Sequence, residues 1–485
     1  MTERSKTTLY VDLDGTLIHS DLLVESCIDM LRRNPLYLLL IPVWLMRGKA
    51  WLKHQIAGRS QVRVDLLPYH NKLLETLRAE RSRGRRLVLM SASDQGLVEE
   101  VATHLDLFDA VYGSDGEHNL SGRHKLQKIQ ELESGQAFAY AGNGRPDLAV
   151  WAQAQEIIAV GTGKRLLRGL EQTGKPVQHF DTGYDLGLEL LRAIRPHQWL
   201  KNVLLFAPLL LVQQSISVSL LAQVMIGFIS FCLCASSVYL LNDLLDLKAD
   251  RQHHEKQYRP FARGSLDLRI GLIASPALLG LAFLLAWLFT PTTFVLVLAL
   301  YYLCTLLYSF LLKRIVLIDV LTLATLYTLR IIAGAAVIPV IPSFWLLAYS
   351  MFIFMSLAIV KRYTELIWLR NSGIRETQGR GYLSSDLDMM AILGSSAALM
   401  SVLVFALYIN SDEISRQYLT PEVLWFICPL LLYVFSRIWL LAHRGELEGD
   451  PVVFALRDRI SQAVVILGVI LLYLARFDWR QILLS

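Results

Sequence analysis

The chain has 485 residues, of which 54% are hydrophobic and 18% are charged, and its formal net charge is +5. Ordinary soluble domains carry roughly 45–50% apolar and about 25% charged residues. The composition therefore excludes a disordered, collagen-like or disulfide-stapled chain and argues against a wholly soluble protein. The five cysteines cannot all pair and are expected to be reduced thiols. The modest positive charge is more typical of basic cytosolic loops than of a nucleic-acid partner.

Hydrophobicity is unevenly distributed and predicts a domain boundary near residue 190. Residues 1–190 alternate short β-rich runs with helical stretches, whereas residues 191–485 are dominated by long apolar segments. The polar first residues run directly into a strand-like segment, so no secretory signal is expected. Such alternation predicts an α/β Rossmann-like domain whose ligand lies at the carboxyl ends of parallel strands. The strands are expected at 7–11, 87–90, 137–141 and 157–160.

The second half predicts an all-α, polytopic membrane bundle. A helix needs roughly 20 mostly apolar residues to cross the hydrocarbon core of a bilayer. About nine segments approach that length. They lie at 199–218, 220–241, 270–289, 293–312, 315–337, 344–360, 391–409, 423–441 and 462–476.

Basic residues in alternate loops predict the orientation of this bundle. The loops on one side contain 18 Lys and Arg residues, whereas the opposite loops and the tail contain only Arg416, Arg476 and Arg480. The positive-inside rule then places the first domain and the active sites in the cytosol of a bacterial-type plasma membrane, with the C-terminus outside. The basic loops are 195–202, 242–269, 313–314, 361–390 and 443–462.

A short apolar segment, 36–46, interrupts the first domain. It contains Pro42 and is too short to span a bilayer. One interpretation is a buried helix of a cap subdomain. The other is a basic amphipathic element that dips into one leaflet and rests the domain on the membrane. The flanking basic residues are Arg32, Arg33, Lys49 and Lys53.

Polar side chains follow the expected strands in a pattern that suits phosphate chemistry. Two carboxylates at a strand end can act as nucleophile and as general acid or base. A hydroxyl and an ammonium group suit the oxygens of a phosphate, and carboxylate or amide oxygens suit Mg²⁺. The set consists of Asp12 and Asp14 after the first strand, Ser91 after the second, Lys125, and Asn143 and Asp147 after a later strand.

This set resembles the haloacid dehalogenase-like phosphatases over about residues 1–165, with a helical cap between 17 and 86. The resemblance implies that Asp12 attacks phosphorus to form an aspartyl-phosphate. It implies that Asp14 protonates the leaving alkoxide and then activates water. The remaining implied roles are phosphate binding by Ser91 and Lys125, and Mg²⁺ binding by Asp12, Asp14, Asn143 and Asp147.

One position departs from the family pattern, because Asn143 stands where the family usually has aspartate. An amide oxygen can bind Mg²⁺ but brings no negative charge, so the affinity for the metal is expected to be lower. A degenerate regulatory domain is therefore an alternative to a working phosphatase. Lys128 is an alternative to Lys125 for the phosphate-binding role.

An acidic run with helical spacing ends the second expected span. It consists of Asn242, Asp243, Asp246 and Asp250, and the three carboxylates share one face of a helix. Carboxylates this close repel one another unless a cation joins them, which predicts a site for Mg²⁺ and a diphosphate at the membrane interface. The alternative, a polar helix end in the cytosol, leaves the basic residues that follow unexplained. These are Arg251, Lys256, Arg259 and Arg263.

The motif Asn-Asp-x-x-Asp-x-x-x-Asp resembles the intramembrane prenyltransferases of the UbiA superfamily over about residues 192–477. Within that superfamily the chain is most similar to the decaprenyl-phosphate phosphoribosyltransferases. Members transfer 5-phosphoribose from phosphoribosyl pyrophosphate (PRPP) to a polyprenyl phosphate and release pyrophosphate. The supporting segments are 195–202, 308–319, 329–334 and 361–365.

The resemblance implies roles for the acidic run and for nearby cations. Asp243 and Asp246 are the expected catalytic carboxylates, and both bind Mg²⁺–PRPP together with Asp250 and Asn242. The acceptor is already an anion, so it needs cations rather than a strong base. A groove between helices would hold its isoprenoid tail. The expected cations are Lys256 and Arg259 for the donor phosphates, and Arg195, Lys201 and Lys313 for the acceptor.

Further polar residues lie within or beside the expected spans. Charges at membrane depth are costly, so Asp319 and Arg330 are expected either to pair or to face one cavity, about three helical turns apart. Cations at span ends are alternatively snorkelling topology signals, and Glu365 is alternatively a solvated loop acid. The remaining substrate-binding candidates are Asn202, Tyr308, Lys361, Arg362 and Glu365, with Arg375 and Tyr382 in the same loop.

The fusion suggests two consecutive reactions. The membrane half would make a polyprenyl-phosphoryl-5-phosphoribose, and the phosphatase half would remove its 5-phosphate to leave a lipid-linked ribose, a precursor of furanose donors such as arabinofuranose. One alternative is an aromatic, quinone-type prenyltransferase that uses prenyl diphosphate and carries a regulatory domain. An alternative of another class is a transporter or lipid-binding scaffold.

Overall fold

A computed structural model describes residues 7–181, 183–211, 217–338, 340–371, 380–411, 414, 418–447 and 449–477. The chain forms two compact units. The first contains residues 1–194 together with 239–276, and the second contains 195–238 and 277–485. The acidic run and the loop that follows it therefore belong to the same unit as the N-terminal domain.

Six parallel strands form the sheet of the first unit, in the order β3-β2-β1-β4-β5-β6. This order is that of a doubly wound Rossmann-type sheet, in which the chain changes direction between β1 and β4. The expected α/β fold is confirmed, and the two edge strands β3 and β6 are additional. The strands are β1 (Thr8–Val11), β2 (Leu87–Asp94), β3 (Ala110–Ser114), β4 (Phe138–Gly142), β5 (Glu156–Val160) and β6 (Val177–Phe180).

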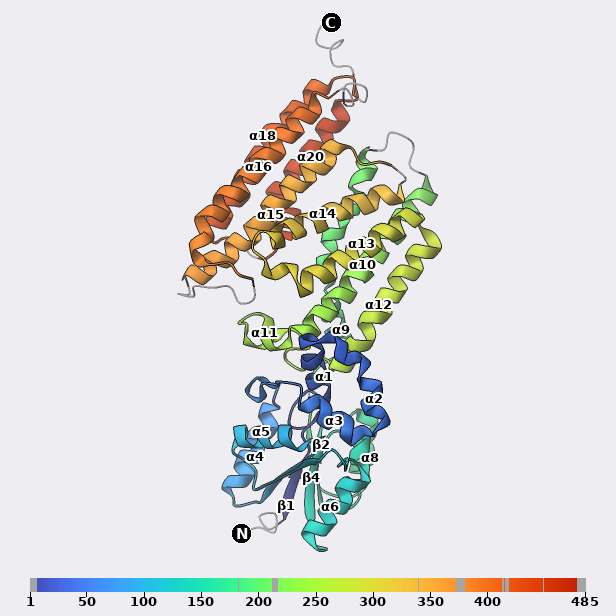
Figure 1. The fold of residues 1–485 in the computed structure, drawn as a ribbon, viewed down its shortest axis with the longest axis vertical. Coiled ribbons are helices and arrows are strands. Elements are labelled where there is room, and N and C mark those ends of the chain that lie inside the picture. Colours follow the sequence, from blue (N-terminus) through green and yellow to red (C-terminus); the bar gives the residue numbers. More distant parts are fainter. Residues whose placement is uncertain are drawn as a thin grey trace. The chain divides into compact units, whose positions relative to one another are not determined.

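Both faces of this sheet are buried at its four central strands, β2, β1, β4 and β5. Leu9 and Val11 belong to one apolar cluster and Tyr10 to another, as the alternation of side chains along a strand requires. Helices α4 and α5 cover the first face, and α6 and α8 cover the second (Figure 1). The main helices of this domain are α1 (Leu22–Arg33), α2 (Ile41–Met46), α3 (Lys49–Ala57), α4 (Asn71–Ser82), α5 (Gln95–Leu105), α6 (Arg123–Glu133), α7 (Leu148–Trp151), α8 (Lys164–Glu171) and α9 (Leu186–Ile194).

The acidic run lies where one helix ends and a short one begins. Helix α10 (Val218–Leu245) ends just before Asp246, and α11 (Leu247–Gln252) follows. The 3₁₀ turn η6 (Lys256–Tyr258) then leads to α12 (Leu268–Phe289). The backbone bonds from the amides of Asp246 and Asp250 continue the helical pattern through this junction. The acidic residues therefore stay on nearly helical geometry.

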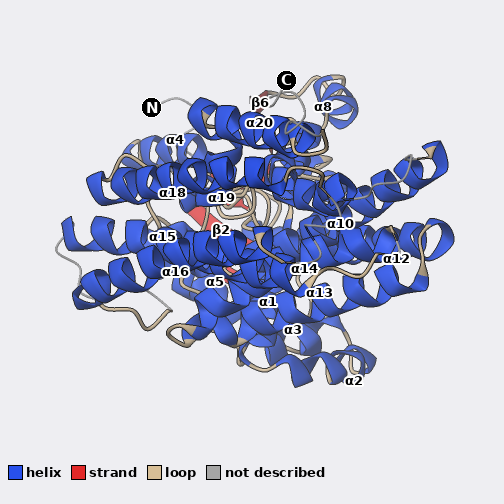
Figure 2. Ribbon diagram, turned by 90° about the horizontal axis from the view of Figure 1, so that it is seen from above, coloured by secondary structure: helices blue, strands red, loops and turns tan. Residues whose placement is uncertain are grey.

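Helices dominate the rest of the described chain (Figure 2). Seven helices among the described residues are long and apolar enough to cross a membrane. The first and last expected spans correspond to the 3₁₀ segment η5 (Pro196–Leu211) and to the 16-residue α20 (Arg459–Leu474), which are shorter. Residues 212–216 of the first lie outside the described residues. The spans include α10, α12, α13 (Thr292–Phe310), α14 (Ile318–Val337), α15 (Phe344–Asn371), α16 (Leu387–Ile409) and α18 (Ile427–Arg444).

The apolar segment 36–46 is not a buried helix of the cap, so that expectation is wrong. It forms the 3₁₀ turn η2 (Pro35–Leu39) and the short helix α2, and of its side chains only Trp44 is buried. Pro35 lies in the first turn of η2 and Pro42 in the first turn of α2. Because proline is tolerated at the start of a helix but not in its interior, the segment forms two short helical elements instead of one long helix. By contrast, all five cysteines are free thiols, as expected.

Candidate functional sites

The carboxylate pair of the first unit lies at the switch point of the sheet. Strand β1 pairs with β2 on one side and with β4 on the other. Asp12 directly follows β1, and Asn143 directly follows β4. Parallel strands place their carboxyl ends at one edge, where ligands of open α/β sheets bind. The fold therefore brings together the polar residues that the sequence places after separate strands.

Asp12 heads a buried chain of hydrogen bonds. The Lys125 ammonium group donates to Asp12 Oδ1 at 2.8 Å and to the Tyr140 hydroxyl at 2.9 Å. The Tyr140 hydroxyl donates to Asp147 Oδ1 at 2.7 Å. Lys128 instead lies on the surface and pairs with Glu131 at 3.4 Å. The structure thus brings Lys125, and not Lys128, to Asp12. Sequence reasoning missed Tyr140, whose only signal is a hydroxyl two residues before the end of an apolar strand.

Asp14 is held by three donors. The hydroxyls of Ser91 and Ser93 donate to Asp14 Oδ2 at 2.9 and 2.7 Å, and the Leu22 amide donates to Oδ1 at 2.8 Å. The first two donors come from the end of β2 and the third from the first turn of α1, the first helix of the cap. The carboxylate that is expected to move a proton is therefore fixed in position by both the core domain and the cap.

Asn143 packs directly against the loop that carries the two carboxylates. A Cβ atom on Gly15 would collide with the Asn143 amide group, and Gly15 has φ +72°, a conformation that favours glycine. The backbone amide of Asn143 donates to Asp147 Oδ2 at 3.0 Å. The side-chain amide of Asn143 therefore lies against Gly15, the residue that follows Asp14 in the loop after β1.

Burial raises the pKa of the Asp12 carboxyl to about 7. Lys125 lowers the pKa, and the neighbouring carboxylates of Asp147 and Asp14 raise it. Among the described residues, no group of three or more His, Cys, Asp or Glu side chains is arranged to hold a metal ion. Mg²⁺ usually takes one or two carboxylates and completes its shell with water and substrate phosphate. Carboxylates crowded in a buried site, with an amide oxygen nearby, fit that requirement.

The cap contributes a cation, Lys53, to the phosphate site. In the sequence this residue stands out only as one of the basic residues that flank the apolar segment 36–46. Lys53, on α3, donates to the carbonyl of Ala92 at 2.6 Å and to Asn119 Oδ1 at 2.8 Å. Ala92 directly follows Ser91. Burial lowers the pKa of Lys53, and the charges of Asp14 and Asp21 oppose that shift. Lys53 therefore lies at the edge of the same site. Only the fold of the cap reveals this position.

In the acidic run, two carboxylates converge on one cation. Arg259 Nη1 donates to Asp243 Oδ1 at 3.1 Å and to Asp250 Oδ2 at 2.7 Å. Burial raises the pKa of Asp250 to about 6; Arg259 lowers the pKa, and Asp243 raises it further. The guanidinium group lies between the two carboxylates and offsets the repulsion between their negative charges. A divalent cation with a diphosphate offsets the same repulsion, so this donor set also fits Mg²⁺.

The segment after the acidic run is tied to the cap and to α9. Arg251 makes two hydrogen bonds to Glu25, at 2.9 and 2.5 Å, and both side chains are nearly inaccessible. Arg269 pairs with Asp21, the N-cap of α1. Arg263 and Ser265 both donate to Glu189, each at 2.5 Å. The acidic run and the cap are therefore parts of one packed structure.

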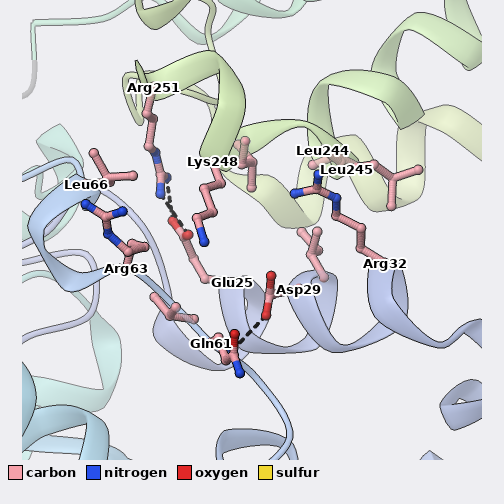
Figure 3. Close-up of a pocket in the computed structure, with 13 residues that line it drawn as sticks. Glu25, Asp29, Arg32, Gln61, Arg63, Leu66, Leu244, Leu245, Lys248 and Arg251 are labelled. Carbon is pink, nitrogen blue, oxygen red and sulfur yellow. Dashed lines mark hydrogen bonds and ion pairs between the residues drawn. The ribbon is translucent and has the colours of Figure 1, made fainter. Parts of the chain in front are cut away.

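A pocket in the first unit lies between α1, residues 61–66 and the junction of α10 and α11 (Figure 3). Arg32 and Leu245 line it together, and Lys248 extends into it from α11. The amide of Gln61 donates to Asp29 at 2.7 Å across its floor. The C-terminal end of α1 is thus a direct neighbour of the end of α10.

In the second unit, five candidate residues form one hydrogen-bonded network whose centre, Arg362 and Asp319, is buried. Arg362 donates to Asp319 Oδ2 at 2.5 Å, to Glu365 at 2.8 Å and to the Tyr308 hydroxyl at 2.9 Å. The Tyr382 hydroxyl also donates to Asp319. The partners of Asp319 are thus Arg362 and Tyr382. Glu365 is part of the network and lies on α15 rather than in a loop, with its side chain 34% exposed.

Arg330 has a separate environment. Its Nε donates to Asn202 Oδ1 at 2.9 Å, and Nη2 donates to the Tyr301 hydroxyl at 3.2 Å. The guanidinium group also lies over the rings of Phe231, Tyr301 and Tyr327, 5.1–5.5 Å from their centroids. Arg330 therefore contacts the candidate Asn202, while aromatic rings surround its guanidinium group.

Two further candidate cations meet at an aspartate that the sequence did not single out. Lys201 and Lys361 donate to Asp450 Oδ2 at 2.5 and 3.2 Å, and the Tyr327 hydroxyl donates to Oδ1 at 3.3 Å. Burial alone raises the pKa of Asp450, but Lys361 and Lys201 outweigh that effect and hold the pKa well below its ordinary value. In the sequence, Gly449-Asp450-Pro451 is typical of an ordinary turn. Only the fold shows that Asp450 is the common partner of the two lysines.

For the remaining candidate residues, the structure shows where they lie but does not test their roles. Asp246 is the N-cap residue of α11, and Lys256 and Lys313 lie in 3₁₀ turns. Arg375 lies outside the described residues. The roles of these residues remain predictions. Those that are half-buried are Arg195, Asn242, Asp246, Lys256 and Lys313.

The fold and these sites define a multi-pass membrane protein with an N-terminal Rossmann-type domain that presents two carboxylates at its switch point. Residues 203–456 match the UbiA prenyltransferase family, and residues 9–151 match the haloacid dehalogenase-like hydrolases. The first match covers more than half of the chain. The chain therefore belongs to the UbiA prenyltransferase family and carries a haloacid dehalogenase-like region at its N-terminus.

Several known proteins are similar to this chain. The protein y4nM of Sinorhizobium fredii is 37% identical over 464 residues, which are 94% of this chain and 88% of that protein. The nodulation protein NoeC of Azorhizobium caulinodans is 36% identical over 281 residues, 58% of this chain and 90% of that protein. The decaprenyl-phosphate phosphoribosyltransferase of Mycolicibacterium smegmatis is 30% identical over 282 residues, 56% of this chain and 87% of that protein.

Proposed function

We propose that this protein transfers 5-phosphoribose from PRPP to a polyprenyl phosphate and then removes the 5-phosphate from the lipid-linked product. The similarity to the decaprenyl-phosphate phosphoribosyltransferases supports the first reaction. One observation carries the coupling of the two reactions: the acidic run and the phosphatase-like domain share one compact unit, closed by the buried Arg251–Glu25 pair. Both reactions would take place on the cytosolic side of the membrane.

In the transfer step, an oxygen of the lipid phosphate forms a bond to the anomeric carbon of ribose. The bond between that carbon and the pyrophosphate oxygen breaks, and pyrophosphate leaves with the electron pair. Asp243, Asp246 and Asp250 position the donor, and Lys256 and Arg259 bind its phosphates. Arg259 already lies between two carboxylates, so it is placed to shift onto a bound diphosphate.

In the hydrolysis step, an Asp12 oxygen attacks the 5-phosphate, and the bond from phosphorus to the ribose oxygen breaks. Asp14 gives a proton to the departing ribose oxygen, which leaves as a hydroxyl. It then takes a proton from the water whose oxygen bonds to phosphorus as the bond from phosphorus to Asp12 breaks. Lys125 and Ser91, which contact Asp12 and Asp14, offset the charge of the phosphoryl oxygens.

Mg²⁺, when bound, supplies Lewis-acid stabilisation of the phosphate oxygens at both sites. The residues that would hold it are Asp12, Asp14, Asn143 and Asp147 in the first site, and Asn242, Asp243, Asp246 and Asp250 in the second. At both sites the surrounding cations bind the anionic substrate groups, and the low exposure of the carboxylates strengthens these interactions.

The experiment that tests this proposal uses the full-length protein in detergent with PRPP, Mg²⁺ and a polyprenyl phosphate, with products identified by mass spectrometry. The Asp12→Asn variant should accumulate the 5-phosphorylated lipid, with phosphate release reduced at least about 10³-fold. The Asp243→Asn variant should form neither lipid product. Lys128→Ala is the matched control, because Lys128 lies on the surface, away from Asp12.

Three outcomes would contradict the proposal in different ways. If the wild-type protein releases no phosphate from the 5-phosphorylated lipid, the two reactions are not coupled. If prenyl diphosphate rather than PRPP is consumed, the protein is an aromatic prenyltransferase. If neither EDTA nor Asp243→Asn affects turnover, the acidic run is not the transfer site.

A further inference from the structure

The first unit carries an apolar segment of which only a few side chains pack against the rest of the domain. We define it as the apolar ridge, residues 35–46, formed by η2 and α2. Most of its large side chains are exposed, and the exposed fraction reaches 72% at Leu39 and 88% at Met46. The other exposed members are Leu36, Leu38, Leu40, Val43 and Leu45.

The ridge has a fixed base. Trp44 is buried with Met30 of α1 and Ile56 of α3, and Tyr37 packs against the same cluster. The Arg59 guanidinium group lies over the Trp44 ring, 5.0 Å from its centroid. The ridge is therefore held in place while it presents leucine, valine and methionine outward. A contiguous exposed apolar surface of this kind marks a contact with another molecule or with a membrane.

The position of the ridge in the first unit favours the membrane as that contact. Helix α10 is one of the membrane-spanning candidates, and Leu244 and Leu245 are its last apolar residues. These two residues line the same pocket as Arg32, near the end of α1 (Figure 3). The chain continues from Arg33 through Asn34 directly into the ridge. The ridge therefore begins beside the point at which α10 ends, and the end of a spanning helix lies at the bilayer surface.

The charge around the ridge supports the same assignment. Residues 30–64 contain no Asp or Glu but seven Lys and Arg residues. Of these, Arg32, Arg47 and Lys49 are exposed at the two ends of the ridge. An apolar strip edged by cations is complementary to anionic head groups that lie above acyl chains.

We propose that the apolar ridge inserts into the head-group region of an anionic leaflet and anchors the phosphatase-like cap on the membrane surface. The ridge is too short to span the bilayer, so it lies in the interface. This contact does not depend on which reactions the protein catalyses. It would hold the site formed by Asp12 and Asp14 close to the lipid head groups.

Site-specific photo-crosslinking tests this contact in the full-length protein in nanodiscs. Benzoylphenylalanine replaces Leu39 or Met46 in the ridge, or Lys128 on α6 as an exposed control. Nanodiscs contain phosphatidylcholine with or without phosphatidylglycerol, and adducts are identified by mass spectrometry. We expect lipid adducts from positions 39 and 46 and none from 128. The Arg47→Gln and Lys49→Gln variants should lower the adduct yield by roughly fivefold for each charge removed.

The contradictory outcomes are equally specific. Absence of lipid adducts at both ridge positions would overturn the proposal. Crosslinks from positions 39 and 46 to a second copy of the chain would show that the ridge is a dimer interface instead. The readout needs no enzymatic activity, so it remains informative even if the proposed reactions are wrong.

Discussion

Lys53 is one of the residues through which the cap contacts the core domain. Its amino group donates to the carbonyl of Ala92, the residue after Ser91 near the end of β2, and to Asn119 Oδ1 in the loop after β3. Its neighbour His54 contacts Asp94 at 2.9 Å but points to the surface. Helix α3 can therefore contribute in two ways, by adding charge to the site and by holding the cap on the core domain, and these two adjacent side chains differ in which they do. Lys53 adds charge to the site, whereas His54 only helps to fasten the cap.

Replacing Lys53 by alanine should therefore weaken substrate binding rather than the chemical step. We expect KM for a phosphomonoester to rise about tenfold with little change in kcat, because one charge-assisted contact is lost. Steady-state phosphate release measures both constants. His54→Ala is the control and should change KM less than about threefold. Equal effects of the two variants would mean that Lys53 only fastens the cap.

At the scale of elements, the Arg251–Glu25 pair fastens α11 to α1. Both side chains are nearly buried, whereas the Arg33–Asp29 pair on the same helix α1 is largely exposed on the arginine side. Removing one partner of a buried pair leaves an uncompensated charge, while an exposed pair contributes little. The two pairs therefore provide a direct comparison within one helix.

We expect Glu25→Gln to lower the free energy of unfolding of the first unit by about 3–5 kcal/mol. Arg33→Ala should lower it by less than about 1 kcal/mol. Thermal unfolding of the full-length protein in detergent, followed by limited proteolysis of the first unit, measures both. The double variant Glu25→Leu with Arg251→Met should recover most of the loss, since no unpaired charge remains. An effect of Glu25→Gln no larger than that of Arg33→Ala would contradict this account.

Within the second unit, Asp450 connects distant parts of the chain. It joins Lys201 of η5, Tyr327 of α14 and Lys361 of α15, and it is the N-cap of α19 (Pro451–Arg457). Its carboxylate carries negative charge at neutral pH because two ammonium groups hold its pKa low. Without that charge, Lys201 would be left buried and unpaired.

The Asp450→Asn variant should therefore lose about 3–5 kcal/mol of stability and most of the transfer activity. Glu446→Gln is the control, because Glu446 is exposed four residues before it. Thermal unfolding and lipid-product formation give the two readouts. Normal stability together with normal transfer in Asp450→Asn would show that the two lysines need no counter-charge.

Much of the organisation of this protein is present in local sequence patterns. Long apolar runs define the membrane helices because each must be apolar along its own length. The residues after β1, β2 and β4 predict a phosphate site because parallel strands end at one edge. The edge strands β3 and β6 escaped sequence reasoning, since their side chains are only partly buried and lack a continuous apolar run.

Local order and chemical type were thus determined by the sequence alone: an α/β domain with two carboxylates after its first strand, a membrane bundle, and an acidic run between them. The tertiary structure decided which side chains meet, such as Lys53 with the end of β2, Arg259 with Asp243 and Asp250, and Asp450 with two lysines. It also decided that residues 35–46 face outward. The physical reason is that periodicity reports the surroundings of one element, whereas an ion pair joins residues whose separation along the chain carries no information about their distance in space.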